Sequence, residues 1–357
     1  MTRGMANFIV SHPQVFAELA PVFSAVANGQ SVALIPETLD RSTLPDPDPV
    51  LGPQLGVTSS GSTGSPKLSW RTWAELTANT RTSGESVSLK WGSPYRPDTF
   101  AGCQLALQAW MNGTTATSLS FSPNQGWQQL LTQAITAVSC TPTYLYLLLL
   151  NPAATKWEPI QITLGGEPLT TAQGQLFAAR FPKTRFTIVY ASAEHGVLLK
   201  TSRTDGWFES SFLTEHREWK LDQGELHLHT AGGWISTKDR VEEKDSLLRV
   251  VGRSDAVANI AGQKYNLSQI STAAEKCKSV IRAKAGTEPN PITGEIITLN
   301  LTFHPDLSEQ QQLSALAEVQ DWLRAQLPKA AWPRRWIVAP PVLGQNSKEF
   351  SPCATPS

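Results

Sequence analysis

Apolar and polar positions alternate along the first two thirds of the chain in patterns that predict both helices and strands. Residues 1–30 read as a helical pair, 31–36 as a strand, and 37–53, rich in proline and aspartate, as a surface connection. From there to about residue 205, helical and extended stretches take turns, which is typical of α/β layering. The predicted helices are 68–79, 102–111, 125–137, 143–150 and 171–180, and the predicted strands are 51–57, 114–120, 160–164 and 186–190.

The last third changes character twice. Short strands at 208–212, 218–221, 225–230 and 247–251 predict a small β-rich subdomain. Helices at 268–285 and 308–327 with strands at 296–303 and 336–338 predict an α+β module. The expected fold class is therefore α/β: a large N-terminal domain of several subdomains, one of them β-rich, followed by a small α+β C-terminal domain.

Composition narrows the class of protein. The 357 residues carry 30 basic and 30 acidic side chains, and charged residues make up 17%. The neutral balance argues against a nucleic-acid or anionic-membrane surface, and the apolar run 145–150 is too short for membrane insertion. We see no signal peptide, and the cysteines form no CxxC pair, which favours reduced thiols and a cytoplasmic location. They are Cys103, Cys140, Cys277 and Cys353.

One loop carries the clearest chemical signal. It reads Thr58-Ser59-Ser60-Gly61-Ser62-Thr63-Gly64-Ser65-Pro66-Lys67. Backbone N–H groups and hydroxyls of such a loop can surround a phosphate, although the spacing is not that of a Walker loop. A flexible linker is the alternative on composition alone. A predicted strand before the loop and a predicted helix after it favour a ligand-binding turn.

Further motifs follow the loop in a fixed order, and together they resemble the adenylate-forming acyl-CoA synthetases, which include peptide-synthetase adenylation domains and luciferase. The motifs are Gly165-Gly166-Glu167-Pro168-Leu169, Tyr190-Ala191-Ser192-Ala193-Glu194, Thr237-Lys238-Asp239, Gly252-Arg253-Ser254-Asp255 and Asn346-Ser347-Lys348. Each motif is weak alone, whereas their order across residues 51–350 makes the resemblance strong.

The resemblance implies ATP, Mg²⁺ and coenzyme A as cofactor, metal and cosubstrate, and it implies a role for each motif. Thr58 to Gly64 and Lys67 would hold phosphates, Glu194 would bind Mg²⁺, and Lys348 would act in adenylation. The nucleoside would contact Gly165, Gly166, Glu167, Tyr190, Asp239 and Arg253. Asp255 would be a hinge, Gly262, Gln263 and Lys264 would face coenzyme A, and Ala191 and His195 would line the acyl pocket.

Simpler interpretations stay open for single residues. Glu194 could be an ordinary loop glutamate and Tyr190 a core aromatic. Lys348 could be a disordered tail lysine, because the nearby residues 351–357 look unstructured. His227 and His229 alternate on a predicted strand, but two ligands without a third favour a sheet-surface pair over a metal site.

The chain also departs from the family pattern. Ala191 and Ala193 stand where the family has glycine and threonine, Ser347 replaces a glycine, and less chain than usual precedes the phosphate loop. These differences leave a degenerate nucleotide-binding protein as an alternative of another class.

The resemblance implies an acid–thiol ligase with an N-terminal domain at 1–254 and a C-terminal domain at 255–350. Its substrates would be a small carboxylic acid, ATP and coenzyme A. Residues 139–145 resemble the Val-Pro-Thr segment of the o-succinylbenzoate–CoA ligases, which are also compact. This resemblance implies o-succinylbenzoate as the acid, and hence menaquinone or phylloquinone biosynthesis. An aryl- or fatty-acid–CoA ligase and a carrier-loading enzyme are the alternatives. The oligomeric state is left open.

Overall fold

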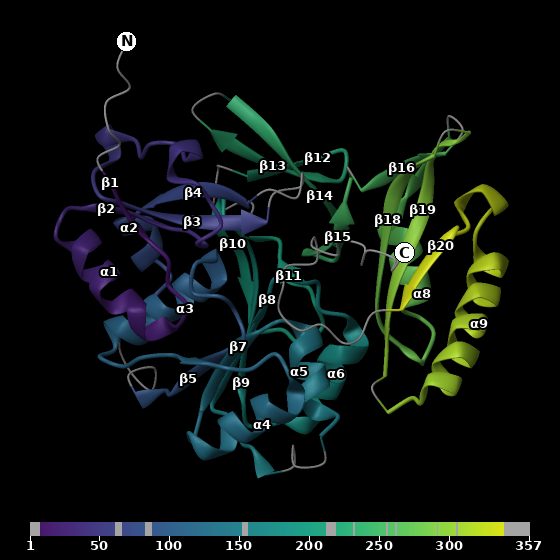
Figure 1. Cartoon of the computed structure of the whole chain (residues 1–357), viewed down its shortest axis with the longest axis horizontal. Helices are drawn as coiled ribbons and strands as arrows, with labels where there is room; N and C mark the ends of the chain where they lie inside the picture. The colour runs from purple at the N-terminus through teal and green to yellow at the C-terminus, as the bar shows by residue number, and fades with distance from the viewer. Residues whose placement is uncertain are drawn as a thin grey trace, which may run out of the picture. The chain divides into compact units, whose positions relative to one another are not determined.

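The computed structural model describes residues 8–60, 66–82, 88–151, 156–211, 219–230, 233–254, 256–260, 263–290, 292–304 and 306–338. The chain divides into two compact units, with the boundary between Gly206 and Trp207. Strands and helices interleave in both units (Figure 1), so the predicted α/β fold class is confirmed. The predicted domain boundary at residues 254 and 255 stays a prediction.

The first unit contains a four-stranded sheet in the order β1-β2-β3-β4. Its strands are β1 (Phe8–Ser11), β2 (Ser31–Leu34), β3 (Gln54–Ser60) and β4 (Pro66–Thr72). The first three strands run parallel, and β4 pairs antiparallel with β3 from Gln54↔Thr72 to Ser60↔Pro66. The strands β3 and β4 thus form the two arms that flank the predicted phosphate loop.

The second sheet of this unit has the strand order β10-β9-β8-β7-β5-β6. It is built from β5 (Trp91–Ser93), β6 (Thr117–Ser118), β7 (Ala137–Cys140), β8 (Gln161–Gly165), β9 (Arg185–Ser192) and β10 (Gly196–Thr201). The strands β5 to β9 pair in parallel, whereas β10 returns antiparallel along β9. Parallel strands of a sheet end at the same edge, which brings the turns after β7, β8 and β9 together.

Helices surround these sheets and supply the core. They are α1 (Leu19–Ala27), α2 (Trp73–Thr77), α3 (Phe100–Met111), α4 (Pro123–Thr132), α5 (Pro142–Leu149) and α6 (Thr171–Arg180). The helix α3 packs against both β3 and β5. Its buried residues Cys103 and Leu107 join Leu55 of β3 and Trp91 of β5 in one apolar cluster, so α3 ties the two sheets together.

The second unit contains two further sheets. One has the order β11-β15-β14-β13-β12, and the other contains β17-β16-β19-β18 with β20 beside β19. Their strands are β11 (Phe208–Glu209), β12 (Trp219–Asp222), β13 (Glu225–Thr230), β14 (Gly233–Lys244), β15 (Leu247–Arg253), β16 (Val257–Ile260), β17 (Gln263–Asn266), β18 (Val280–Asn290), β19 (Gly294–Phe303) and β20 (Arg335–Val338). The helices α8 (Leu267–Ala274) and α9 (Glu309–Gln326) pack on the second of these sheets, where Ile270, Val319 and Leu299 share one core (Figure 1).

Several predicted elements were wrong in type or extent, among them the strands predicted at 114–120 and 208–212, which cover only Thr117–Ser118 and Phe208–Glu209. Residues 8–11 form β1 instead of a helix, because their apolar run pairs with β2. Residues 68–72 belong to β4, and helix α2 starts only at Trp73. The predicted helices 125–137 and 268–285 each end early, at Thr132 and Ala274, and their remaining apolar residues start the strands β7 and β18. The structure also contains β10, β14, β16 and β17, which the sequence patterns did not indicate.

Candidate active site

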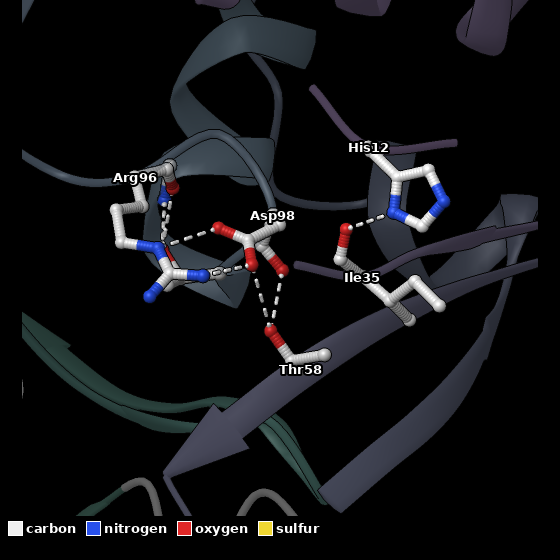
Figure 2. A network of polar contacts seen from close by, with 7 residues as sticks. His12, Ile35, Thr58, Arg96 and Asp98 are labelled. Carbon is white, nitrogen blue, oxygen red and sulfur yellow. Dashed lines mark hydrogen bonds and ion pairs between the residues drawn. The ribbon is translucent and has the colours of Figure 1, made fainter. Parts of the chain in front are cut away.

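The arms of the predicted phosphate loop are fixed to the rest of the first unit through Thr58. Its N–H donates to the carbonyl of Asp98 at 3.0 Å, and its hydroxyl lies 3.1 Å from that carbonyl and 3.3 Å from the Asp98 carboxylate. Arg96 donates to the same carboxylate through Nε at 3.0 Å (Figure 2). Thr58 and Asp98 are both buried. Asp98 therefore anchors the end of β3 where the loop begins.

This anchoring gives Thr58 a structural partner that sequence reasoning missed. The hydroxyl of Thr58 is engaged with Asp98, so its predicted contact with phosphate stays a prediction. Of the other loop residues, Ser59 and Ser60 end β3, and Lys67 is exposed on β4 opposite Ser59. Gly61, Ser62, Thr63 and Gly64 lie outside the described residues. The loop joins two strands, which corrects the predicted strand–loop–helix arrangement.

The turn after β8 carries the predicted glycine pair. Gly166 has φ +78°, a backbone conformation that glycine adopts without strain. The hydroxyl of Tyr95 donates to the carbonyl of Gly165 at 2.9 Å. Burial of that hydroxyl, and then the proximity of Cys140 and Glu167, raise the pKa of Tyr95 well above its usual value. The phenol therefore stays protonated as a donor and holds this turn in place.

The turn after β7 is linked to the same glycine turn. Thr141 caps helix α5, and its hydroxyl accepts from the N–H of Tyr144 at 3.1 Å. One residue into the helix, the hydroxyl of Thr143 donates to Glu167 Oε2 at 2.6 Å. Glu167, predicted to contact the nucleoside, is thus held by α5. Residues 139–145, on which the prediction of o-succinylbenzoate depends, lie next to the glycine turn.

Tyr190 and Ala191 lie at the end of β9, and the third turn, which connects β9 to β10, carries Glu194 and His195. Tyr190 pairs in register with Leu199, and the N–H of His195 donates to the hydroxyl of Ser192 at 3.0 Å. Ala193 is buried, whereas Glu194 is exposed. The structure therefore places these residues at the same sheet edge as Gly165, Gly166 and Glu167, as the parallel topology requires.

Arg71 of β4 lies against this third turn and was missed by sequence reasoning. Its Nε donates to the carbonyl of Ala193 at 3.2 Å, and Nη1 lies 3.5 Å from Glu75 Oε1. Burial lowers the pKa of Arg71, while the charges of Glu75 and then Glu194 oppose that shift. An arginine stays charged under such conditions, so a buried cation lies beside the predicted Mg²⁺ ligand.

In the second unit, Asp239 of β14 and Arg253 of β15 are cross-strand partners. Their nearest charged atoms, Oδ1 and Nη1, are 3.8 Å apart. Gly252 has φ +139°, and a Cβ there would lie 2.8 Å from Ser268 Oγ. Close packing of helix α8 against β15 therefore accounts for the glycine of the Gly-Arg-x-Asp motif.

The remaining predicted residues of the second unit are only partly described. Gln263 and Lys264 are exposed on β17. Asp255, Gly262 and Lys348 lie outside the described residues, as do Ser347 and residues 351–357. The roles predicted for all of these residues, including the hinge and the adenylation lysine, stay predictions.

The described residues fit a metal ion held by few protein ligands, as Mg²⁺ bound with phosphate is, but not an ion held by a cluster of side chains. They contain no group of three or more His, Cys, Asp or Glu side chains that could hold an ion. His227 and His229 alternate on β13 with the buried Leu226 and Leu228, as expected of a sheet-surface pair. Mg²⁺ commonly uses one or two protein carboxylates together with phosphate oxygens, which fits the single carboxylate of Glu194.

No family model matches the sequence, and no curated protein matches it. No helix in the described part of the chain is long and apolar enough to cross a membrane. Because no sequence comparison found a match, the similarity to known proteins is one of three-dimensional structure.

Three solved structures illustrate that similarity. A variant of Escherichia coli MenE with bound OSB-AMS is 14% identical, with TM-score 0.65 over 94% of this chain and 84% of its own. The amide bond synthetase McbA from Marinactinospora thermotolerans is 16% identical, with TM-score 0.60 over 95% and 78%.

The o-succinylbenzoate CoA synthetase (MenE) from Bacillus subtilis, in complex with the acyl-adenylate intermediate OSB-AMP, is 15% identical, with TM-score 0.54. The match covers 80% of this chain and 65% of that protein, so this chain spans less than two thirds of its length. All three comparisons agree in architecture, and the chain therefore has the fold of the adenylate-forming ligases.

Proposed function

We propose that this protein activates a carboxylic acid with ATP and transfers the acyl group to the thiol of coenzyme A. The observation that carries the proposal is the gathering of three turns at one sheet edge, after β7, β8 and β9, in the fold of the adenylate-forming ligases. These turns contain the glycine pair Gly165-Gly166, Glu167 and Glu194, in the order of the family's motifs.

The proposed reaction has two steps. A carboxylate oxygen of the acid attacks the α-phosphorus of ATP, the bond to the bridging oxygen breaks, and pyrophosphate leaves. The sulfur of coenzyme A then attacks the acyl carbon, and AMP leaves with the electron pair of the broken C–O bond. Such transfers depend mainly on positioning and on neutralising oxygen charges. Mg²⁺, when bound, would supply part of that neutralisation, and Glu194 would hold it.

The chain's own residues would position the substrates. The phosphate loop between β3 and β4 would hold the phosphates, and the Gly165-Gly166 turn would present open backbone to the nucleoside. Asp239 would accept hydrogen bonds from adjacent ribose hydroxyls, with Arg253 beside it. Lys348 would bring a positive charge to the α-phosphate.

We further propose o-succinylbenzoate as the acid. Two of the structural neighbours are MenE enzymes with OSB-AMS or OSB-AMP bound, which supports this choice. The amide bond synthetase among the neighbours shows that the fold also occurs with another acceptor chemistry. The acceptor must therefore be tested separately from the acid.

The test is a pyrophosphate-release assay with ATP and Mg²⁺ over a panel of carboxylic acids, with and without coenzyme A. We expect succinylbenzoate to drive release and the CoA thioester to be detected by mass spectrometry. Lys348→Ala should slow adenylation by about 100-fold, the scale of removing one group that stabilises transition-state charge. Lys329→Ala, an exposed lysine of the second unit, is the matched control and should keep full activity.

Each contrary result has a distinct meaning. Pyrophosphate release with a different acid, and none with succinylbenzoate, would contradict o-succinylbenzoate as the substrate. An acyl-adenylate that reacts only with a carrier protein or an amine would contradict coenzyme A as the acceptor. ATP binding without adenylation of any acid would favour the degenerate nucleotide-binding protein.

A further inference from the structure

Arg71 is a buried cation on the strand that leaves the phosphate loop. It lies on β4, four positions after Lys67, and is 8% exposed. Arginine is rarely buried to this extent unless it is paired. Since burying a charge is costly, the groups around the guanidinium must compensate for the water that it has lost.

The guanidinium contacts the turn that carries Glu194. Nε donates to the carbonyl of Ala193, the residue directly before Glu194, at 3.2 Å. The negative charges of Glu75 and Glu194 both stabilise the cation. Arg71 therefore acts on this turn through a hydrogen bond to its backbone and through attraction to its carboxylate.

The other side of the turn is shaped around the same guanidinium. Gly196 has φ +75°, and a Cβ at this position would lie 3.5 Å from Nη2 of Arg71 and 4.0 Å from Phe100. Nη2 is itself buried and has no hydrogen-bond partner among the described residues. The turn thus folds closely over Arg71, from Ala193 on one side to Gly196 on the other.

We propose that Arg71 is a positioning residue that holds the turn at Ala193–Gly196 so that the Glu194 carboxylate is oriented for Mg²⁺ bound with ATP. This inference rests on the proposed function, because the role of Glu194 belongs to it. Since β4 also bears Lys67, one strand would set the geometry of both the phosphate loop and the metal-binding turn.

Arginine suits this role better than lysine. Its planar fork reaches the Ala193 carbonyl through Nε and Glu75 through Nη1 at the same time. A lysine could keep the charge but would donate to fewer of these partners. Arg71→Lys should therefore restore part of what Arg71→Leu loses, whereas a role limited to filling space would give the opposite ranking.

Two measurements on the full-length protein test the proposal, with Arg41→Leu as control. Arg41 also donates to a backbone carbonyl, that of Phe8, but lies away from the turn. In hydrogen exchange without nucleotide, we expect amides 193–196 to exchange about tenfold faster in Arg71→Leu than in wild type. In ATP titrations, the affinity gained on adding Mg²⁺ should fall about tenfold in Arg71→Leu, with affinity in EDTA changed by less than about threefold.

The two measurements separate this inference from the proposed function. Unchanged exchange in the turn, or equal weakening of ATP binding with and without Mg²⁺, would contradict the positioning role of Arg71. A wild-type protein that binds no ATP at all would contradict the proposed function, and the exchange measurement would still decide the role of Arg71.

Discussion

Single buried side chains determine where the loop and turns of the first unit lie. Arg71 of β4 donates a hydrogen bond to the carbonyl of Ala193. Asp98 accepts hydrogen bonds from Thr58, through its carbonyl from the N–H and through its carboxylate from the hydroxyl. Neither residue belongs to a recognisable motif. The sequence places Asp98 just before a helix cap at Thr99, but no local pattern indicates that its carboxylate bonds to a residue 40 positions earlier.

Asp98→Ala should destabilise the first unit. The substitution removes the buried carboxylate that accepts from Arg96 and Thr58, so we expect the free energy of unfolding to fall by about 2 kcal/mol, the scale of a hydrogen bond to a charged group. Asp98→Asn keeps the shape and should cost less. Urea denaturation at neutral pH measures both. Asp48→Ala, an exposed aspartate that caps a short helical turn, is the control, and an equal loss there would contradict the expectation.

The buried thiol of Cys103 should lower the free energy of unfolding of the protein at alkaline pH. Burial raises the pKa of Cys103 to about 12, from 9.0. Between these values the unfolded chain releases the thiol proton and the folded chain keeps it, so stability falls as pH rises, by up to about 1.4 kcal/mol per pH unit. Unfolding free energies of wild type and Cys103→Ala between pH 8.5 and 10.5 should therefore show a shallower decline in the variant. Parallel declines would contradict this assignment.

At the scale of elements, helices with local signals were easier to predict than strands. Helix α6 starts with the capping box of Thr170 and Gln173, and the prediction of 171–180 matches its bounds. Strand β4 was mistaken for a helix because Leu68 and Trp70 alternate over too few residues to outweigh the helix that follows. Its identity depends on pairing with β3, and β18 likewise depends on β19. Each of these strands pairs with its neighbour across a hairpin, and the apolar pattern of one segment alone does not indicate that pairing.

Gly102→Ala tests how helix α3 supports the loop that carries Asp98. A Cβ at this position would lie 2.0 Å from the carbonyl oxygen of Arg96, so the loop or the helix must move. We expect a loss of about 2 kcal/mol in unfolding free energy and faster hydrogen exchange at the Thr58 amide, which donates to Asp98. Ala101→Ser, at the neighbouring half-buried position, is the matched control. Unchanged exchange at Thr58 would show that α3 does not fix this loop.

At the scale of the whole molecule, the fold class predicted from the sequence is confirmed, and the predicted domain boundary stays a prediction. The ordered motifs implied the fold that the structure shows. The resemblance also implied a domain boundary at 254 and 255, which stays a prediction beside the division into compact units between Gly206 and Trp207. Gly252 of β15 packs closely against Ser268 of α8. This packing favours a single compact unit that contains both sheets of the second unit.

Fragments of the chain test this division. We expect residues 207–342 to unfold cooperatively and to be more stable than 255–342, because the shorter fragment loses the packing of Gly252 on Ser268. Residues 1–206 should also fold without the β11–β15 sheet. Circular dichroism during heating and dispersion of amide NMR signals measure both. If 255–342 were as stable as 207–342, and 1–206 less stable than 1–254, the boundary implied by the resemblance would be correct.

The sheet edge after β7, β8 and β9 has a consequence for evolvability. Val138, Leu164 and Ile188 lie buried within these strands, whereas the side chains to which the proposed function assigns ligands lie at or after the strand ends, in three separate turns. Specificity can thus drift turn by turn while the scaffold is inherited intact, in keeping with a shared architecture at 14% identity. A directed-evolution library at these turns should therefore spare Thr141, Gly166 and Ala193, which cap a helix, adopt a positive φ and lie buried, respectively.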